Sequence, residues 1–400
     1  MKVLVLNCGS SSLKYTFFSM TQERRIASGI VECIGLPEAY YKHKVSGGEE
    51  IKEPCRAKDH VSAIDLVMKN LMESEHKVIN DINEISIIGH RVVHGGEKFS
   101  SSVLINDEVL EDIKECFVMA PLHNPQNYEG IVACQKVLPG VPQVAVFDTA
   151  FHQSLPKQAY FYALPYSLYT KYNIRRYGFH GTSHRYIALR TAEMLNRPLN
   201  ELKLITCHLG NGCSISAIKN GESIDTSMGF TPLEGLVMGT RCGDIDPAIL
   251  THLMTHEKIS AEDLNTLLNK KSGIFGISGL TSDMRTILQS VAAGSERAKL
   301  ALDVFCYRIK KYIASYIGVL NGIDALVFTA GIGENSPTIR EKSCAELENL
   351  GIILDPEANA RVIATEGVIS NAQSPAKVLV VPTNEELMIA RESVAVLTKN

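Results

Sequence analysis

Short apolar runs alternate with helix-spaced apolar positions along the whole chain. Residues 3–7, 85–88, 143–147 and 325–328 are apolar runs of the length that buried strands have. From residue 295 onward the apolar residues instead recur with a 3.6-residue period. They place the following side chains on one helix face: Ala298, Leu302, Phe305, Ile309, Tyr312 and Tyr316. Strands that alternate with helices predict the α/β class.

Capping residues give the predicted ends of several helices. Asp59 precedes a helical pattern that carries Val61, Ile64, Met68 and Leu71 on its apolar face. The pair Ser336-Pro337 starts another helix, which we expect to end near Gly351. The pair Lys310-Lys311 is interpreted as the solvated face of the long helix that begins at residue 295.

The first polar turn of the chain is suited to binding a phosphate. It reads Cys-Gly-Ser-Ser-Ser-Leu-Lys over residues 8–14, between two apolar runs. Gly9 lets the backbone approach an anion, the hydroxyls donate hydrogen bonds and Lys14 adds a positive charge. The spacing excludes a P-loop, which needs G-x-x-x-x-G-K-[ST] before a helix. An ordinary polar hairpin turn is the alternative.

A similar strand and turn recur about half a chain later. Residues 4–10 align with residues 205–211 at a constant offset, and each stretch runs from a strand into a glycine-containing turn. A third glycine-rich turn, 329–337, follows a strand and precedes a helix, where backbone N–H groups can meet a phosphate. This plan matches the actin-like ATPase and sugar-kinase superfamily, with ribonuclease H-like domains.

The predicted fold is therefore α/β, with two duplicated actin-like ATPase domains facing each other across a cleft. We expect an N-terminal domain over residues 1–150, completed by the C-terminal segment 384–400. The second domain, 151–383, is expected to hold the nucleotide site and the dimer interface.

Composition excludes several classes of partner. With 45% hydrophobic residues, 21% charged residues and a net charge of -4, the chain is an ordinary globular protein without the basic excess that nucleic acid or an anionic membrane would require. No apolar stretch is long enough to span a membrane or form a signal peptide. The ten cysteines are scattered singly, so they predict reduced thiols in the cytoplasm.

Eight ordered motifs resemble the acetate kinase family. They are VLNCGSSSLKY (5–15), GHRVVHGG (89–96), VFDTAFH (146–152), YGFHGTSH (177–184), HLGNGCS (208–214), GFTPLEGLVMGTRCGDIDP (229–247), TAGIGEN (329–335) and PTNEE (382–386). The resemblance implies the reaction ATP + acetate ⇌ ADP + acetyl phosphate. It also implies Mg²⁺, with Mn²⁺ as the alternative metal, and a cytoplasmic homodimer.

The resemblance also assigns the acceptor site. A carboxylate acceptor needs a cation, and a planar guanidinium fits it best; the family places Arg91 and Arg241 there. It implies a small acyl pocket lined by Val93, Leu122, Phe179 and Pro232. Because one methylene is worth only about 1–3 kcal/mol of discrimination, propionate should be a poorer substrate rather than an excluded one.

The transferred phosphoryl group carries spread negative charge, so positioning and electrostatic stabilisation should dominate catalysis. By resemblance His180 and Arg241 reach its oxygens, with Asn211 nearby. His123 and His208 are secondary candidates.

Mg²⁺ prefers oxygen ligands and takes one or two protein carboxylates. The family candidates are Asn7, Glu385 and Asp148. Asp148 is also cast as a general base, but acetate is already ionised near neutral pH, so we favour orientation of the metal or its waters.

The resemblance places the nucleotide on three segments. The predicted contacts are Lys14, His208, Leu209, Gly210, Asn211 and Gly212 at the phosphates, and Asp283, Met284, Arg285, Gly331, Ile332, Gly333, Glu334 and Asn335 around the adenosine.

We expect direct in-line transfer, with no phosphorylated Glu385 intermediate. Two alternatives stay open from the sequence. One is the same chemistry on a longer acid, as in a propionate or butyrate kinase. The other is a non-catalytic actin-like ATP switch, which would lack an arginine pair for a small carboxylate.

Overall fold

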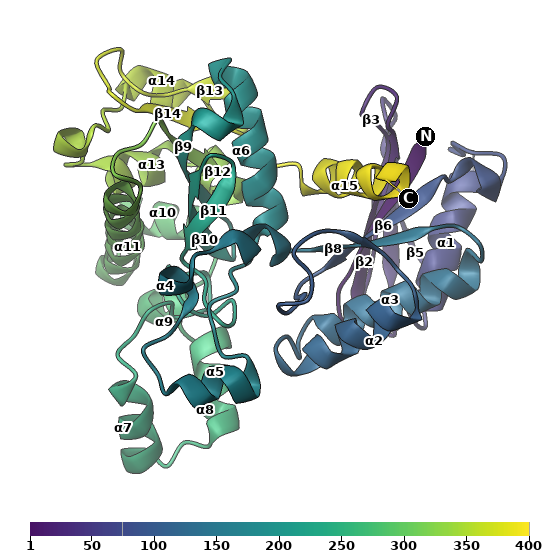
Figure 1. Ribbon diagram of the computed structural model, residues 1–400, viewed down its shortest axis with the longest axis horizontal. Helices are drawn as coiled ribbons and strands as arrows, with labels where there is room; N and C mark the ends of the chain where they lie inside the picture. Colours follow the sequence, from purple (N-terminus) through teal and green to yellow (C-terminus); the bar gives the residue numbers. More distant parts are fainter. Residues whose placement is uncertain (74, 400) are drawn as a thin grey trace. The chain divides into compact units, whose positions relative to one another are not determined.

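The computed structural model describes residues 1–73 and 75–399, which form two compact α/β units (Figure 1). Unit 1 comprises Met1–Gln153 together with the C-terminal segment that begins at Asn384, and unit 2 comprises Ser154–Thr383. The first boundary therefore lies three residues beyond the predicted position 150. The two units are described separately below.

Unit 1 is built on a mixed eight-stranded sheet with the order β5-β4-β3-β2-β1-β6-β8-β7. Its strands are β1 Lys2–Cys8, β2 Ser12–Ser19, β3 Arg24–Glu32, β4 Tyr40–Val45, β5 Glu50–Pro54, β6 Ile87–Val92, β7 Val103–Leu104 and β8 Gln143–Phe147. Strand β1 runs antiparallel to β2 and parallel to β6, and β6 runs parallel to β8. The carboxyl ends of β1, β6 and β8 therefore lie at one edge of the sheet.

Helices cover both faces of this sheet. The helices are α1 His60–Met72, α2 Asp107–Glu115, α3 Asn124–Val137 and α15 Glu385–Lys399. Because side chains alternate along a strand, Leu4 and Leu6 of β1 enter a core with α1 and α3, whereas Val5 points toward Ile389 of α15 on the other face. The predicted helix after Asp59 is confirmed, and the Asp59 carboxylate caps it by accepting from Ser62 N at 2.8 Å.

Unit 2 repeats the central topology of unit 1. Its six-stranded sheet has the order β11-β10-β9-β12-β14-β13, with strands β9 Lys203–Leu209, β10 Cys213–Lys219, β11 Glu222–Thr226, β12 Ala325–Thr329, β13 Gly367–Val368 and β14 Lys377–Val380. Strands β9, β10, β12 and β14 pair in the same directions as β1, β2, β6 and β8. Both β1 and β2 start 201 residues before their counterparts, so the duplication predicted from the sequence is confirmed.

The helices of unit 2 are α4 Lys157–Tyr160, α5 Tyr166–Tyr172, α6 Gly181–Leu195, α7 Ala248–His256, α8 Ala261–Lys270, α9 Gly273–Ser278, α10 Met284–Ala292, α11 Glu296–Leu320, α12 Ala330–Asn335, α13 Pro337–Cys344 and α14 Pro356–Arg361. Across both units, short 3₁₀ turns occupy Ile82–Glu84, Cys116–Val118, Ala150–Ser154, Leu199–Glu201 and Glu348–Leu350. The predicted apolar face of α11 is buried, except that Tyr312 is half-buried, and Ser295 caps the helix.

Three local predictions were wrong. The strand predicted over 85–88 is β6, which starts at Ile87 because Ile85 closes the preceding 3₁₀ turn. The helix that starts after Ser336 ends at Cys344 rather than near Gly351, since the backbone leaves the helical region at Ala345 (ψ 136°) and turns left-handed at Glu346 (φ 60°). Lys310 is half-buried and pairs with Glu346 at 2.5 Å, so only Lys311 is fully solvated.

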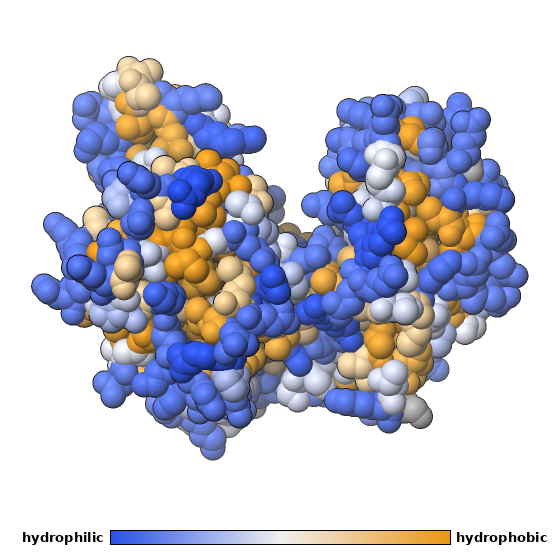
Figure 2. Space-filling view, turned by 90° about the horizontal axis from the view of Figure 1, so that it is seen from above, coloured by the Kyte–Doolittle hydropathy of each residue, from blue (hydrophilic) through white to orange (hydrophobic). Residues whose placement is uncertain are grey.

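The surface is mostly polar. Figure 2 shows hydrophilic side chains over much of the visible face, with apolar patches between them. Within the described ranges, no helix combines the length and apolarity required of a membrane span. All ten cysteines have free thiols.

Candidate active site

The site in unit 1 centres on an ion pair between Arg91 and Asp148. Arg91 lies on β6 and Asp148 directly follows β8, whose register with β6 brings Val92 opposite Phe147. Arg91 Nη2 donates to Asp148 Oδ2 at 2.6 Å, and Nε lies 3.1 Å from both carboxylate oxygens. Asp148 is 1% exposed, so this carboxylate is held in place almost out of water. Its charge raises the pKa of Arg91 further above the ordinary value, which keeps the guanidinium charged.

Glu385 is the second carboxylate beside Arg91. It is the first residue of α15, and Asn384 before it accepts from Leu387 N at 3.0 Å, which caps the helix. Glu385 Oε1 is buried, without a hydrogen-bond partner among the described residues. Burial and the neighbouring Asp148 and Glu386 carboxylates raise the pKa of Glu385 to about 7, although Arg91 and Lys14 act in the opposite direction. Glu385 Oε1 is therefore a buried oxygen that is available to coordinate a cation.

Asn7 and Lys14 complete this part of the site. They are directly opposite each other on β1 and β2, so the turn between those strands presents both side chains on the face covered by α15. Both line a cavity of about 20 Å³ with Arg91, Glu385 and Glu386. This space is on the scale of one water molecule. The structure thus brings together four residues that the sequence predicted separately.

Val93 is fixed at the end of β6 by a side-chain amide. Its backbone N–H donates to Asn127 Oδ1 at 3.1 Å, and Asn127 Nδ2 donates to Cys8 O at 2.9 Å. The Val93 side chain is 7% exposed. Leu122, the other predicted pocket residue in unit 1, is 57% exposed in the loop before α3. His123 follows it as the residue before α3.

In unit 2, a chain of buried hydrogen bonds orients His180. His180 precedes α6 in a left-handed conformation (φ 56°), and its Nδ1 lies 2.8 Å from Ser214 Oγ. Ser214 Oγ also lies 2.8 Å from His184 Nε2, and His184 Nδ1 lies 2.6 Å from Thr206 Oγ1. These hydrogen bonds fix the Nδ1 edge of the His180 ring and direct its Nε2 at the turn between β9 and β10.

Arg241 meets His180 at that turn. A Cβ built on Gly212 would lie 2.8 Å from Arg241 Nη2 and 3.4 Å from His180 Nε2, so glycine permits both groups to approach the backbone. Arg241 Nη1 donates to Pro232 O at 2.7 Å. Burial lowers the pKa of Arg241, although a guanidinium remains charged. Phe179, the residue before His180, is 2% exposed.

The turn between β9 and β10 also carries the predicted phosphate contacts. His208 stacks on His180 with ring centroids 4.1 Å apart, and its Nδ1 lies 2.8 Å from Ser183 Oγ. Asn211 O accepts from Gly239 N at 3.1 Å, and Gly210 N donates to Gly212 O at 3.1 Å. Leu209 is fully buried, so only its backbone is offered to a ligand.

The residues predicted around the adenosine differ in exposure. Asp283 caps α10 and pairs with Arg285, whose side chain is 89% exposed. Met284 is 4% exposed, so its side chain belongs mainly to the core. The two ends of the Asp283–Arg285 segment are thus open to a ligand, whereas its middle residue offers little surface.

The third glycine-rich turn forms the short helix α12. A Cβ on Gly331 would meet nothing within 4 Å, so the backbone there is open, whereas Gly333 is buried. Glu334 Oε1 accepts from Thr383 N at 3.0 Å, which directs this carboxylate into unit 2 itself. Asn335 Nδ2 donates to Gly331 O at 2.9 Å, and Ile332 between them is half-buried.

Comparison with known proteins gives the family of the chain. A family model described as the acetokinase family matches residues 2–391. The chain belongs to the acetokinase family. An acetate kinase of Caldicellulosiruptor saccharolyticus is 57% identical over 402 residues, covering 100% of both chains. A crystal structure of Porphyromonas gingivalis acetate kinase is 48% identical, with a TM-score of 0.95 and 99% of each chain covered. A propionate kinase from Francisella tularensis subsp. tularensis SCHU S4 is 44% identical, with a TM-score of 0.92 and coverage of 98% of this chain and 99% of that one.

The acetokinase chain uses several residues at the site that sequence reasoning missed. Ser214 and His184 hold His180, and Asn127 holds the backbone at Val93. Ser214 and His184 lie inside motifs that were quoted, but nothing in their spacing shows that they meet. Glu386 lines the small cavity next to Glu385, and its place at the end of the motif 382–386 was the sequence signal that could have pointed to it.

The donor set in unit 1 fits a divalent metal of the Mg²⁺ type. Across residues 1–73 and 75–399 there is no cluster of three or more His, Cys, Asp or Glu side chains that could form a complete metal cage. Mg²⁺ does not need one, because it keeps several waters and takes only one or two carboxylates. The buried Glu385 Oε1, the Asn7 amide oxygen and the space between them match that requirement. Mn²⁺ accepts the same oxygen donors.

Proposed function

We propose that this chain is an acetate kinase, which transfers the γ-phosphoryl group of ATP to acetate and forms ADP and acetyl phosphate reversibly. The observation that carries the proposal is the Arg91–Asp148 pair beside Glu385, a fixed cation between two carboxylates next to a space of ion size. An arginine with no role beyond solvation would not need to be held between two carboxylates. In an acetokinase chain it matches a small carboxylate acceptor and a metal.

Arg91 binds the acetate carboxylate through the edge that Asp148 leaves open. Asp148 uses Nε and Nη2, and no described residue accepts a hydrogen bond from Nη1. The Nη1–Nη2 edge therefore offers two parallel donors, which match the two oxygens of a carboxylate. Val93, two residues further on, limits the space for the methyl group. On the family resemblance we also assign selection of the acyl group to Leu122, Phe179 and Pro232.

His180 and Arg241 stabilise the charge of the phosphoryl group as it moves. Their approach to the backbone at Gly212 gathers two donors at one point of the turn, and Asn211 adjoins it. Fixed donors that need no rearrangement are worth more than solvent during transfer. Acetate attacks the γ-phosphorus in line, so the phosphoryl group passes directly to it.

Asn7 and Glu385 would hold the metal, and we assign Asp148 to the orientation of the metal or its waters. When bound, Mg²⁺ would neutralise charge on the phosphate oxygens. Asp148 is unsuited to the role of a general base, because Arg91 already occupies both of its oxygens and acetate is ionised near neutral pH.

The nucleotide phosphates are assigned to Lys14 and the turn 208–212, and the adenosine to the segments 283–285 and 331–335. The open backbone at Gly331 and the exposed Arg285 support this assignment. We assign the surface near Met284 to the adenosine as well, although the burial of that side chain limits its part. A cytoplasmic homodimer is proposed on the family resemblance, and light scattering after gel filtration tests it.

Propionate is the second candidate acceptor, since a propionate kinase shares this fold at 44% identity. One assay decides between them. Purified protein is incubated with ATP, Mg²⁺ and hydroxylamine, and acyl hydroxamate formation is compared for formate, acetate, propionate and butyrate. We expect the highest kcat/KM with acetate. A higher value with propionate or butyrate would reassign the substrate, and no hydroxamate with any acid would favour the ATP switch.

A further inference from the structure

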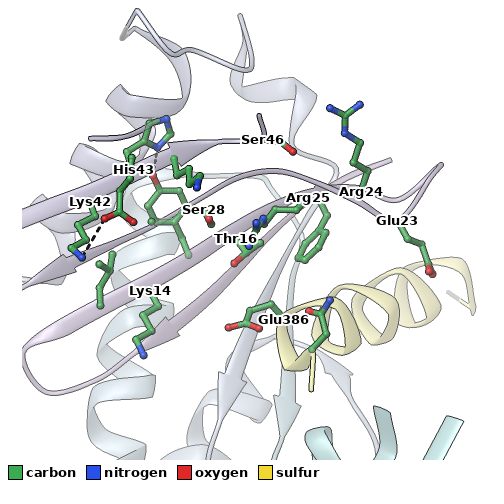
Figure 3. Close-up of a pocket in the computed structure, with 17 residues that line it drawn as sticks. Lys14, Thr16, Glu23, Arg24, Arg25, Ser28, Lys42, His43, Ser46 and Glu386 are labelled. Carbon is green, nitrogen blue, oxygen red and sulfur yellow. Dashed lines mark hydrogen bonds and ion pairs between the residues drawn. The ribbon is translucent and has the colours of Figure 1, made fainter. Parts of the chain in front are cut away.

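Unit 1 has a second, larger cavity on the outer half of its sheet. Helix α15 packs mainly on β1, β6 and β8, whereas β3, β4 and the far part of β2 form the floor of a cavity of about 900 Å³ (Figure 3). Glu386 and Asn384 border it at the start of α15. All of its lining residues belong to unit 1.

The strand register gathers cations on this floor. Lys14, Ile30 and Lys42 form one row across β2, β3 and β4, and Thr16, Ser28 and Lys44 form the next row. Since alternate residues share a face, all six side chains project to the same side of the sheet. At a bulge in β3, Arg25 is opposite Phe18, which is two residues after Thr16 on β2. Arg25 therefore lies on the same face as the two rows. Figure 3 shows Arg25 among Thr16, Ser28 and Glu386 on this side.

Most of these cations have no carboxylate partner. Five cationic residues line the cavity, Lys14, Arg24, Arg25, Lys42 and Lys44, against the carboxylates of Glu23, Glu50 and Glu386. Glu50 pairs with Lys42 at 3.3 Å, and Glu23 pairs with Arg391 at 2.6 Å. Among the described residues, Lys14, Arg24, Arg25 and Lys44 form no ion pair. The cavity is therefore cationic in a chain whose net charge is -4.

The stability of the sheet does not account for these lysines. Lys42 on β4 is directly opposite Lys52 on β5, and like charges in that position are destabilising. Lysines are common on edge strands, where they prevent aggregation, but β4 lies inside the sheet and β5 is the edge. Lys52 lies over the Tyr40 ring and does not line the cavity, so Lys42 is the lysine of this pair that an anion in the cavity would contact.

We propose that this cavity is a binding site for a compact phosphate anion with at least two charges, of the diphosphate class, separate from the phosphoryl-transfer site. Lysine and arginine donors with neighbouring hydroxyls are the groups that bind phosphate oxygens. The aromatic residues of the lining, Tyr15 and Phe18, are each 3% exposed and offer no face for stacking a nucleobase. The site thus suits the phosphate groups themselves rather than a nucleoside. The proposal does not rest on acetate kinase activity, because Arg24, Arg25, Lys42 and Lys44 have no part in the proposed reaction. Of the charged residues of the lining, only Lys14 and Glu386 also line the small cavity at the catalytic residues.

The test is calorimetric titration of the full chain with inorganic pyrophosphate, in the presence of EDTA and at low salt. The variant Arg25→Ala/Lys44→Ala should bind at least tenfold more weakly than the wild type. Lys69→Ala/Lys136→Ala removes the same charge from exposed positions on α1 and α3 and should bind within twofold of the wild type. The single variants Arg25→Ala and Lys44→Ala serve if the double variant does not fold.

The variant Arg241→Ala distinguishes the two anion sites. It removes a donor of the proposed phosphoryl-transfer site and should still bind pyrophosphate as the wild type does. The Arg25→Ala/Lys44→Ala variant should also keep its acetate-dependent activity within twofold, so that failure of the proposed reaction and failure of this site are distinguishable. Equal binding in the wild type and the Arg25→Ala/Lys44→Ala variant, or loss only in Arg241→Ala, would overturn the proposal. Binding of a single-stranded oligonucleotide without binding of pyrophosphate would overturn it too, in favour of a nucleic-acid surface.

Discussion

Arg91 and Asp148 lie 57 residues apart in the chain and share a bidentate ion pair at the carboxyl ends of two adjacent parallel strands. Parallel pairing of β6 with β8 places Arg91 opposite Val146, so Asp148, two residues further along, lies on the same face and within reach of the guanidinium. The pair orients the guanidinium so that its remaining edge faces away from Asp148. Its consequences can be measured directly.

Asp148→Asn should weaken the use of acetate on the order of 100-fold in kcat/KM, because Arg91 loses the charge that orients it. A positioning role predicts that KM for acetate rises at least as much as kcat falls. Steady-state hydroxamate kinetics measure both. Asp112→Asn, which removes a carboxylate paired with Lys98 in the same unit, should have little effect. A fall in kcat at unchanged KM would instead favour a general base.

Ser214→Ala should reduce kcat by about tenfold or more, since it removes the hydroxyl that lies between His180 and His184. Ser216→Ala is the matched control, because Ser216 is on the same strand, is equally buried and bonds to Ser223 instead. Kinetics should be compared with the melting temperatures of both variants. Equal loss of kcat in the two variants would show that the effect is general to the strand rather than specific to His180.

Val93→Ala should improve propionate relative to acetate, up to about tenfold in the ratio of kcat/KM, by lowering the steric cost of one methylene. The backbone at residue 93 should stay in place, because its N–H bond to Asn127 does not involve the side chain. Competition of the two acids in one hydroxamate assay measures the ratio. An unchanged ratio would remove Val93 from the acyl pocket.

Glu385→Asp should require more Mg²⁺ and recover part of its kcat when Mg²⁺ is raised, because the carboxylate moves back by about one methylene. A required nucleophile would not be rescued in this way. Incubation with γ-labelled ATP without acetate should leave no stoichiometric acid-stable label on the protein. Stoichiometric, kinetically competent label on Glu385 without Mg²⁺ rescue would establish two displacements instead of one.

His90 should make the stability of unit 1 depend on pH. Burial lowers the pKa of His90 from 6.5 to about 4, against the opposing effect of its 2.7 Å hydrogen bond to Gln143. Between these pH values the unfolded state binds a proton that the folded state excludes, so the free energy of unfolding falls as pH falls below about 6.5. From pH 7.5 to 5 this costs about 2 kcal/mol.

His90→Gln should remove that share of the pH dependence while keeping a polar group toward Gln143. Urea denaturation followed by circular dichroism at pH 7.5 and 5 gives the difference. The exposed His252 supplies the control, since His252→Gln should keep the wild-type dependence. An identical pH dependence in His90→Gln would show that other groups carry it.

Local features of the fold were predictable from the sequence. The strand at 143–147, the cap at Asp59 and the long helix after Ser295 all depend on residues within a few positions of each other. The helix after Ser336 was predicted too long, because no glycine or proline marks the point after Cys344 where Ala345 leaves the helical region and Glu346 turns left-handed. Glutamate rarely adopts this conformation, so composition gave no warning.

From the sequence alone, the duplication of the domain and most of the residues proposed for the site could be predicted. Periodicity and turn chemistry are local, and a repeat survives as an offset of 201 residues without any knowledge of contacts. Only the tertiary structure decided that Arg91 meets Asp148, that Ser214 lies between two histidines, and that lysines from β2 and β4 share one floor. Each of these contacts depends on strand register or helix packing, and a shift of one residue would turn the same side chains to the opposite face.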